Sequence, residues 1–420
     1  MAMVGLDTAV VNVALPSIQR DLGVAAGALQ WIVVAYGLLL GGFLLVGGRM
    51  TDQLGRRRVF LAGLAVFTAA SLLAGAAHGT GVLIAARGAQ GFGAALVVPA
   101  ALSLLAVHFP EGPERDRAFG IFGATGGAAG TVGVVIGGLL TAGPGWRWSF
   151  LINVPAGLAL IVLTAVFLAA DRAGDRAPRL DLAGATTVTG GLLLLIYAMH
   201  HPMWLPVAAA LLALFVWIEA RSAAPLVPAS ILKNRTLVAA NLTAFFTTCA
   251  LLSFIFTGSL LMQQALGYSA ATTGVAWLAT TVIIFPASMA GARLVTVVGV
   301  RRLLTTGLTF LAAGTVWLAL GHTTYLTGLL PAFVLAGLGF GLCGPALQIG
   351  ALTGVSRSAA GLASGLVETM REIGGAAGVA AVSVVLVAGS GFNAAFLAIG
   401  VLAVLGVITA RFIPSTRSLS

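Results

Sequence analysis

The amino-acid sequence predicts an all-α membrane protein with two six-helix halves and two further helices between them. Three observations support this fold class. Only 8% of the 420 residues are charged and 59% are hydrophobic, whereas about 25% of the residues of a soluble domain are charged. Apolar runs of the length needed to cross a bilayer, about 20 residues, recur from one end of the chain to the other. Basic residues gather in every second connection between these runs.

Fourteen apolar segments are expected to form the spanning helices. They lie near residues 1–16, 28–48, 59–77, 81–106, 118–142, 150–170, 182–199, 205–219, 236–260, 272–292, 303–320, 326–350, 359–388 and 392–412. We expect an N-terminal six-helix half, two linker transmembrane helices with cytoplasmic loops, a C-terminal six-helix half and a cytoplasmic tail. These four regions cover residues 1–170, 171–235, 236–412 and 413–420.

The basic residues predict the orientation of the chain. Eighteen of the 22 Lys and Arg residues fall in one alternate set of connections, whereas the other set holds only Arg20 and Arg147. The remaining two, Arg87 and Arg371, lie inside spans. Because cytoplasmic loops of membrane proteins are enriched in basic residues, the pattern predicts an even number of spans with both termini in the cytoplasm. It also assigns the net charge of +10 to topology, so no nucleic-acid partner is expected.

The first span carries an ionisable residue, Asp7, and a polar residue, Asn12, on a nearby face. An ionisable group within a span is costly and indicates a functional site. A carboxyl group removed from water favours its protonated form, so we expect Asp7 to bind and release a proton. The alternative is a carboxylate at the cytoplasmic surface near the start of the helix.

The first span is also expected to be truncated. Its sixteen residues would extend about 24 Å as a helix, whereas the hydrocarbon core is about 30 Å thick. This shortfall points either to a translation start upstream of Met1 or to a damaged first helix.

The connection after the second span has a distinct pattern of glycine and charge, made by Gly48, Asp52, Gly55, Arg56 and Arg57. A carboxylate near a helix N-terminus is stabilised by the helix dipole, and the cytoplasmic side of the loop explains the arginines. We expect Asp52 to belong to a gate that holds one conformer closed.

This pattern recurs after the tenth span, which indicates an internal repeat. Residues 48–58 match residues 292–302, and Gly55 is in register with Gly299. Chance similarity between two basic loops is the alternative, but it does not explain the glycine. Two parallel halves related by an axis along the membrane normal form a transporter architecture.

The fourth span contains Arg87 and Gln90, which lie three residues apart and so share a helix face. A buried guanidinium group requires a partner, for which Asp7 or a bound anion is the candidate. The alternative is that Arg87 extends along apolar surface to the membrane face.

The fifth span is crowded with glycine, including Gly133, Gly137 and Gly138. Small residues allow transmembrane helices to approach closely, so these positions predict tight helix packing.

The thirteenth span carries a charged cluster of Glu368, Arg371 and Glu372. Residues three and four apart can pair along a helix. The cluster either exchanges protons or is a self-neutralised structural feature, and the sequence favours neither.

Several function classes are excluded by what the sequence lacks. No G-x-x-x-x-G-K-[ST] loop occurs and no connection exceeds about 20 residues, so this chain has neither the nucleotide-binding loop of an ATP-driven pump nor a soluble catalytic domain. The His and Cys residues have no spacing typical of a metal site. No cofactor, metal or enzymatic activity is expected.

Taken together, these motifs resemble the drug:proton antiporter family with fourteen spanning helices, within the major facilitator superfamily. Residues 6–16 are similar to its first-helix motif, L-D-x-T-x-V-N-V-A-L-P, with Ala9 where Thr is usual. Residues 48–58 resemble the superfamily loop signature G-x-L-A-D-x-x-G-R-R. Residues 87–91 match the fourth-helix motif tied to proton transfer, and residues 146–155 are close to the sixth-helix entry.

One motif departs from the family pattern. Residues 133–138 look like the antiporter motif G-P-x-x-G-G, but Val134 replaces the proline. A marker of export direction is thereby missing, so the substrate and the direction of transport stay open.

The resemblance implies the major facilitator fold and a proton-coupled exporter of hydrophobic or amphipathic small molecules. Its expected partners are a small-molecule substrate, protons and the lipid bilayer, and the family expectation is a monomer. Asp7 and Arg87, with Glu368 or Glu372, would exchange a proton for substrate. The alternatives are a proton-coupled carrier of a specific metabolite, and a non-transporting membrane sensor or intramembrane enzyme.

Overall fold

The computed structural model contains helices and no strands within the residues it describes, which are 2–109, 114, 129–130, 132–168, 182–198, 201–222, 225, 234–321, 324–352 and 360–414. The chain divides into two compact units, Met1–Leu226 and Val227–Ser420. Three sequence expectations fall outside the described part: the end of the cytoplasmic tail, most of the fifth span before residue 132, and the side chain of Asp52.

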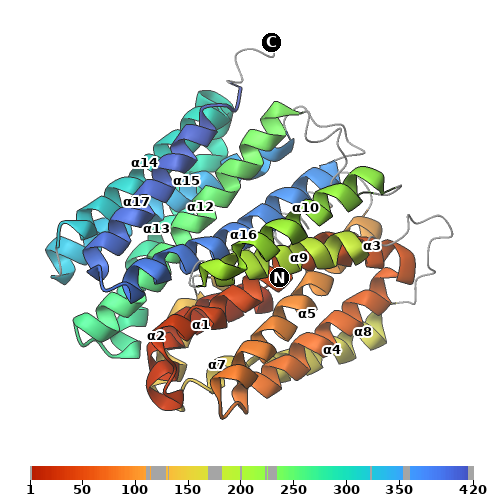
Figure 1. Ribbon diagram of the computed structural model, residues 1–420, viewed down its shortest axis with the longest axis horizontal. Helices are drawn as coiled ribbons and strands as arrows, with labels where there is room; N and C mark the ends of the chain where they lie inside the picture. The colour runs from red at the N-terminus through yellow and green to blue at the C-terminus, as the bar shows by residue number, and fades with distance from the viewer. Residues whose placement is uncertain are drawn as a thin grey trace. The chain divides into compact units, whose positions relative to one another are not determined.

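The first unit begins with the helices α1 to α5 and ends with the helical pair α9 and α10 (Figure 1). In chain order the elements are α1 (Ala2–Leu22), α2 (Ala26–Leu29), α3 (Trp31–Leu54), α4 (Arg56–Gly75), α5 (Thr80–His108), an unlabelled helix (Val132–Ala142), α7 (Trp148–Leu151), α8 (Asn153–Phe167), α9 (Leu182–Ala198), the 3₁₀ turn η1 (Pro202–Trp204) and α10 (Leu205–Arg221).

The second unit consists of long helices. One of them, α12, continues into a π-helical turn, and another, α15, is preceded by one. In chain order these are α12 (Arg235–Leu260), η2 (Leu261–Ala265), α13 (Ala270–Val298), α14 (Val300–Ala319), η3 (Tyr325–Leu329), α15 (Leu330–Leu352), α16 (Ala360–Val387) and α17 (Gly391–Ala410).

The helices account for the predicted spans. Among the described residues, twelve helices are long and apolar enough to cross a membrane, and two shorter apolar helices cover Val132–Ala142 and Thr186–Ala198. Each of the fourteen predicted segments overlaps one of these helices. The all-helical membrane fold expected from the composition is confirmed.

The first helix is longer than its predicted sixteen residues. α1 has 21 residues and continues through Pro16 to Leu22, so it extends about 32 Å. A proline inside a helix removes one backbone hydrogen bond, but transmembrane helices tolerate this where neighbouring groups satisfy the freed carbonyl. The expected end at Pro16 was therefore wrong.

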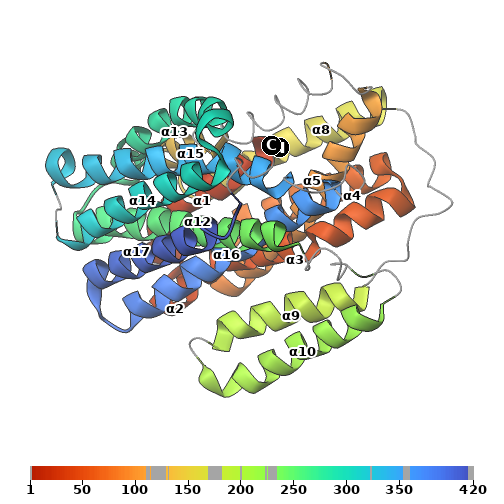
Figure 2. The same cartoon turned by 90° about the horizontal axis from the view of Figure 1, so that it is seen from above.

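Within the first unit, α5 forms the centre of the packing, with α3 and α4 against it and α8 against α4. α9 packs on α3, and α10 packs on α9 as an outlying pair (Figure 2). A methyl group at Gly91 of α5 would lie within 2.2 Å of the Tyr36 carbonyl oxygen. This close approach of α5 to α3 brings the polar residues of the two helices together.

The two units repeat the same local structure. Gly55 separates α3 from α4 with φ of 93°, and Gly299 separates α13 from α14 with φ of 85°. These positive φ angles favour glycine, which explains why the sequence pattern keeps this residue in both loops. Gly63 and Gly307 each lie eight residues after these glycines. A methyl group added at Gly63 would lie 2.9 Å from the Gly93 carbonyl oxygen, and one added at Gly307 would lie 2.7 Å from the Gly339 carbonyl oxygen.

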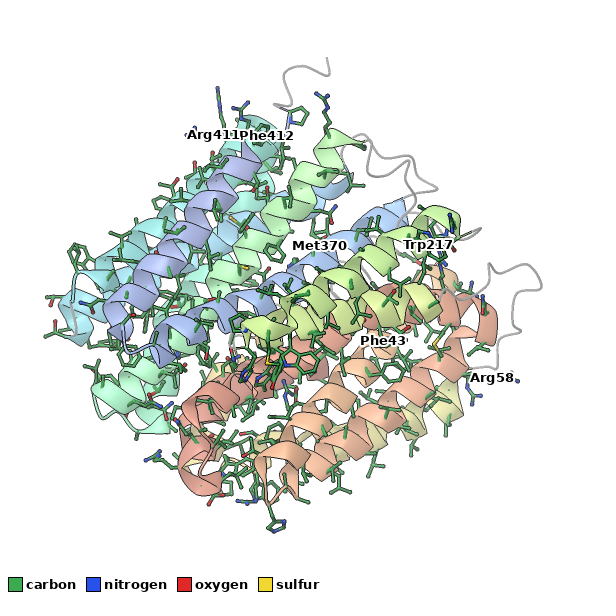
Figure 3. All side chains as sticks on the ribbon, viewed as in Figure 1. Phe43, Arg58, Trp217, Met370, Arg411 and Phe412 are labelled. Carbon is green, nitrogen blue, oxygen red and sulfur yellow. The ribbon has the colours of Figure 1, made fainter. Side chains whose placement is uncertain are left out.

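Large apolar side chains project from the helices, as expected of surfaces that face lipid (Figure 3). Trp217 of α10 is 53% exposed and Phe412, just after α17, is 72% exposed. Arg58 and Arg411 lie at helix ends, near the start of α4 and directly after α17. Apolar helix surfaces with basic ends are typical of membrane-spanning bundles.

Candidate functional site

A buried ion pair joins α1 to α5 in the first unit. Arg87 Nη1 lies 2.5 Å from Asp7 Oδ2, and the two side chains are 1% and 0% exposed. Of the two candidate partners of Arg87, Asp7 or a bound anion, the structure shows Asp7. Neither residue lies at the protein surface, so the alternatives of a surface carboxylate and a surface-reaching arginine do not describe these side chains.

The second carboxylate oxygen of Asp7 accepts two more hydrogen bonds. Asn153 at the start of α8 donates from Nδ2 to Asp7 Oδ1 at 2.7 Å, and Gln90 donates from Nε2 to the same oxygen at 3.1 Å. Both oxygens of Asp7 therefore face donors from other helices.

The guanidinium group of Arg87 is satisfied on several sides. Its Nε donates to the Ile32 carbonyl oxygen at 2.9 Å, and Nη1 donates to Gln90 Oε1 at 2.9 Å. Its Cζ lies 4.3 Å from the centre of the Tyr36 ring, within the range of a cation–π interaction. A buried ion pair is tolerated when the remaining donors find partners in this way.

The network continues from α5 into α4. Gln90 Nε2 donates to Ser71 Oγ at 2.7 Å, and Ser71 Oγ donates to the Phe67 carbonyl oxygen at 2.7 Å. Side chains or carbonyls of α1, α3, α4, α5 and α8 thus meet around one carboxylate. Of these helices, α5 and α8 contact the Asp7 carboxylate directly, and α3 and α4 join the network through Arg87 and Gln90.

Asn12 does not join this network within the described residues. Its Nδ2 donates to the Thr8 carbonyl oxygen at 2.8 Å, and its buried Oδ1 has no hydrogen-bond partner.

Asn153, Ser71 and Tyr36 were not among the residues expected at the site. Asn153 falls within the sixth-helix pattern 146–155, which was the one available signal. Ser71 had none, because a serine hydroxyl in a helix usually bonds to its own backbone. Tyr36 had none, because an aromatic ring in an apolar span usually packs against apolar neighbours.

The glycines of the helix Val132–Ala142 hold α1 beside the ion pair. A methyl group at Gly133 would lie 2.9 Å from Ala9 Cβ, and one at Gly137 would lie 2.8 Å from Val10 Cα. Gly138 is buried in the same helix. The backbone of this helix therefore contacts α1 within one turn of Asp7.

The loop between α3 and α4 is tied to other helices by its arginines. Arg56 Nε donates to Ser103 Oγ of α5 at 2.8 Å. Arg57 Nη2 donates to the Ala165 carbonyl oxygen at 2.8 Å, at the C-terminal end of α8. A cation at this end of a helix is favoured by the helix dipole. Gly48 lies one helix turn before Asp52, and a methyl group there would lie 3.8 Å from Pro99 Cβ.

The charged cluster of the second unit lies on α16. Arg371 Nη1 is 2.9 Å from Glu368 Oε2, with 31% and 22% of the side chains exposed. Glu372 follows on the next face of the helix and is half-buried. The pairing along the helix that the spacing predicted is present.

Comparison with known proteins decides the family. The profile of the Major Facilitator Superfamily matches residues 1–379 and, in a second match, residues 242–420. The chain belongs to the Major Facilitator Superfamily. Members of this superfamily are transporters rather than enzymes.

Curated relatives match almost the whole chain. The puromycin resistance protein of Streptomyces alboniger is 39% identical over 94% of this chain and 81% of its own length. The cephamycin export protein of Amycolatopsis lactamdurans is 40% identical over 94% of this chain and 85% of its own length. The crystal structure of the human organic anion transporter MFSD10 covers 98% of this chain and 97% of its own, with a TM-score of 0.67 and 17% identity, which shows a shared fold.

The two units of this superfamily member differ at corresponding positions. Gly93 and Gly339 make equivalent helix contacts, and the same offset relates Arg87 to Phe333 and Phe150 to Phe396. In the second unit these aromatic residues pack with Phe254 and Trp277, and the Trp277 and Phe333 rings stack with centroids 4.4 Å apart. At the position that corresponds to Arg87, the second unit therefore carries a phenylalanine that packs in an aromatic cluster.

Proposed function

We propose that this chain is a proton-coupled exporter of hydrophobic or amphipathic small molecules in a bacterial cytoplasmic membrane, with both termini in the cytoplasm. The observation that carries the proposal is the buried Asp7–Arg87 pair and its four further hydrogen bonds in a Major Facilitator Superfamily chain. The names of relatives that confer puromycin resistance or export cephamycin support the export direction and the substrate class.

Asp7 is the proposed proton carrier. While it is ionised, its contacts with Arg87 and Asn153 hold α1 against α5 and α8. A proton on Asp7 removes the negative charge and leaves Arg87 without its counter-ion, so the network is stable only in one protonation state. A two-state transporter changes its preferred conformer when such a contact is lost. Moving one charge across the membrane is worth about 2.3 kcal/mol per 100 mV, which is enough to concentrate a substrate.

The remaining site residues have proposed roles around this step. Asp52 and the loop arginines form a cytoplasmic gate, in which Arg57 ties α4 to the end of α8. Glu368, Arg371 and Glu372 form a second group of titratable side chains on α16. Substrate and protons cross by alternating access of the two halves, as in other transporters built from repeats, and the working unit is a monomer.

Reconstituted protein tests the proposal. Purified full-length chain in proteoliposomes should move puromycin when a pH gradient is imposed, and collapse of the gradient with nigericin should stop the movement. Asp7→Asn should abolish gradient-driven transport. Asp21→Asn is the matched control, because Asp21 is an exposed carboxylate paired with Arg147 outside the network. Transport that persists without a gradient, or in Asp7→Asn, contradicts the proposal.

A further inference from the structure

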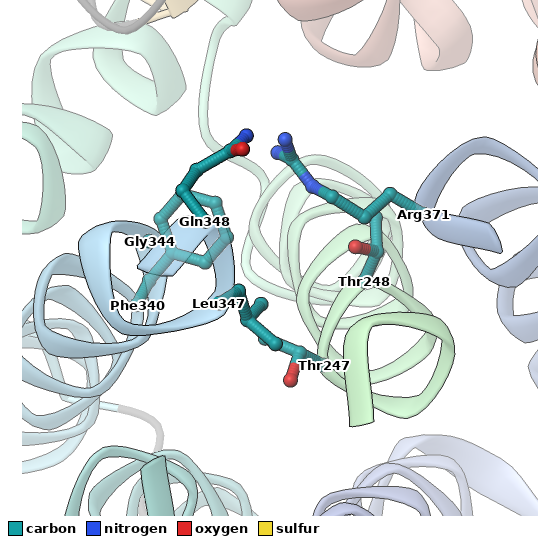
Figure 4. A pocket seen from close by; sticks show the side chains of 7 residues that line it. All are labelled: Thr247, Thr248, Phe340, Gly344, Leu347, Gln348 and Arg371. Atoms are coloured by element: carbon teal, nitrogen blue, oxygen red, sulfur yellow. The ribbon is translucent and has the colours of Figure 1, made fainter. Parts of the chain in front are cut away.

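A small pocket in the second unit lies between α12, α15 and α16 (Figure 4). The space that the centre of a water molecule can occupy within it is about 10 Å³. One bound water molecule requires roughly 10–15 Å³ by this measure, together with two to four polar partners. The pocket therefore matches a single water molecule in size and is too small for a ring or a chain.

Polar side chains from all three helices line this pocket. They are Thr247 and Thr248 on α12, Gln348 on α15 and Arg371 on α16. Figure 4 shows the guanidinium group of Arg371 and the amide of Gln348 extending toward each other. Buried cavities that stay dry in proteins are apolar, so a lining of this kind favours a hydrated pocket.

The two threonines of α12 can accept hydrogen bonds, but their own hydrogens are already used. Thr247 Oγ1 donates to the Thr243 carbonyl oxygen at 2.7 Å. Thr248 Oγ1 donates to the Ala244 carbonyl oxygen at 3.2 Å. Each hydroxyl oxygen still has a lone pair to offer, so α12 can accept a hydrogen bond from a water molecule.

Arg371 supplies the donors of α16. Its Nη1 lies 2.9 Å from Glu368 Oε2, but a guanidinium group has five N–H donors and no acceptor. A water oxygen can accept from a remaining donor of Arg371, while the two water hydrogens are donated to a threonine oxygen and to Gln348 Oε1. One water molecule would thus satisfy groups on three helices at once.

Gly344 leaves space in the lining of the pocket. A methyl group added at Gly344 would meet no atom within 4 Å. At the nearby Gly341, a methyl group would lie 2.7 Å from the Ile284 carbonyl oxygen. Helix packing therefore requires glycine at position 341 but not at position 344, where a small side chain could take the place of a water molecule.

We propose that this pocket binds one structural water molecule, which joins α12, α15 and α16 through a threonine, Gln348 and Arg371. The water gives Arg371 a partner besides Glu368, so the guanidinium group stays bonded when Glu368 is neutral. An anion such as chloride fits less well, because Glu368 already neutralises Arg371 and Glu372 follows directly on α16. Such a site depends on neither proton coupling nor the transported molecule.

Hydroxyl-radical labelling by synchrotron X-rays, with the full chain in lipid nanodiscs, tests for the water. Radicals formed from a bound water molecule oxidise the side chains around it. Leu347 lines the pocket and is 4% exposed, whereas Leu342 on the same helix lies outside the lining and is 8% exposed. We expect severalfold faster oxidation of Leu347 than of Leu342, and loss of this excess in Gly344→Ala. Equal or slower oxidation of Leu347 would overturn the proposal.

Thermal unfolding in detergent of two variants at position 344 gives an independent test. Alanine fills the space without a polar group, whereas serine fills it and places a hydroxyl group where the water would lie. Gly344→Ser should therefore melt about 2–4 °C above Gly344→Ala, the shift expected from one net hydrogen bond in a unit of about 200 residues.

Gly190 provides the matched control, because it is also a half-buried glycine inside a helix. A methyl group there would make only an ordinary contact with Leu211 at 3.9 Å. Gly190→Ser should not melt above Gly190→Ala, since alanine is the better helix former.

Two results of the unfolding test would overturn the proposal. If Gly344→Ala melts above the unaltered protein and Gly344→Ser melts no higher than Gly344→Ala, the pocket is a dry void. If chloride raises the melting temperature and Gly344→Ala abolishes this rise, the pocket binds an anion. Neither measurement uses a substrate or a gradient, so these results are separate from a failure of the proposed export function.

Discussion

Asn153 and Asp7 are 146 positions apart in the chain, yet Asn153 Nδ2 lies 2.7 Å from Asp7 Oδ1. This hydrogen bond links the start of α8 to the middle of α1. It gives the carboxylate a third donor besides Arg87 and Gln90. Asp7 therefore contacts a second helix besides the one that holds its counter-ion.

Replacement of Asn153 tests how far this helix depends on the carboxylate. Asn153→Ala removes one donor to a buried charged group, a loss of about 1.5–3 kcal/mol, so we expect a lower melting temperature and slower gradient-driven transport. Asn241→Ala is the matched control, because Asn241 Nδ2 donates only to the Leu237 carbonyl oxygen of its own helix among the described contacts. Equal effects of the two substitutions would show that the contact to Asp7 has no special role.

The ion pair itself can be tested by a double-mutant cycle. Arg87→Gln alone leaves a buried carboxylate without its counter-ion, which costs about 3–5 kcal/mol. We expect the double variant Asp7→Asn/Arg87→Gln to be more stable than either single variant, because both charges are removed together. Thermal unfolding of the purified variants measures this coupling. Additive losses in stability would contradict a direct pair.

The crossing of α4 and α5 should be sensitive to a single methyl group. Gly63→Ala would place Cβ 2.8 Å from Leu96 Cβ and 2.9 Å from the Gly93 carbonyl oxygen, so we expect a loss of about 1–3 kcal/mol from overpacking. Gly81→Ala on α5 meets no atom within 4 Å and should not lower stability. Unfolding in detergent compares the two, and a neutral Gly63→Ala would show that the helices separate easily.

The bond between Arg57 and the end of α8 should affect conformation more than stability. Arg57→Ala removes a cation from the helix C-terminus, which is worth about 0.3–1 kcal/mol. If the loop is a gate, transport should fall more than this small loss of stability explains. Arg58→Ala removes an exposed neighbouring charge and should have little effect on either. Equal transport by both variants would argue against the gate.

The residues that could be predicted from the sequence were those whose chemistry conflicts with an apolar helix. Asp7 and Arg87 stand out because a charge in a span is costly, and Gly55 and Gly299 stand out because the repeat keeps them in register. Asn153 and Ser71 could not be predicted as partners of Asp7 or Gln90. Polar uncharged side chains are common in spans, and the contacts depend on how distant helices pack.

The end of α1 also could not be predicted from the sequence. α1 continues past Pro16 to Leu22. A proline in a sequence usually indicates a helix end, but transmembrane helices tolerate proline in their interior. The pairing of Arg371 with Glu368 follows from their spacing on one helix.

Proton movement coupled to substrate tests the central claim most directly. A puromycin gradient across proteoliposomes that contain trapped pyranine should drive protons in the opposite direction through the unaltered protein. Asp7→Asn should abolish this pH change. An unchanged pH signal in the triple variant Asp7→Asn/Glu368→Gln/Glu372→Gln would contradict the account, because no titratable group proposed to carry the proton would then be needed.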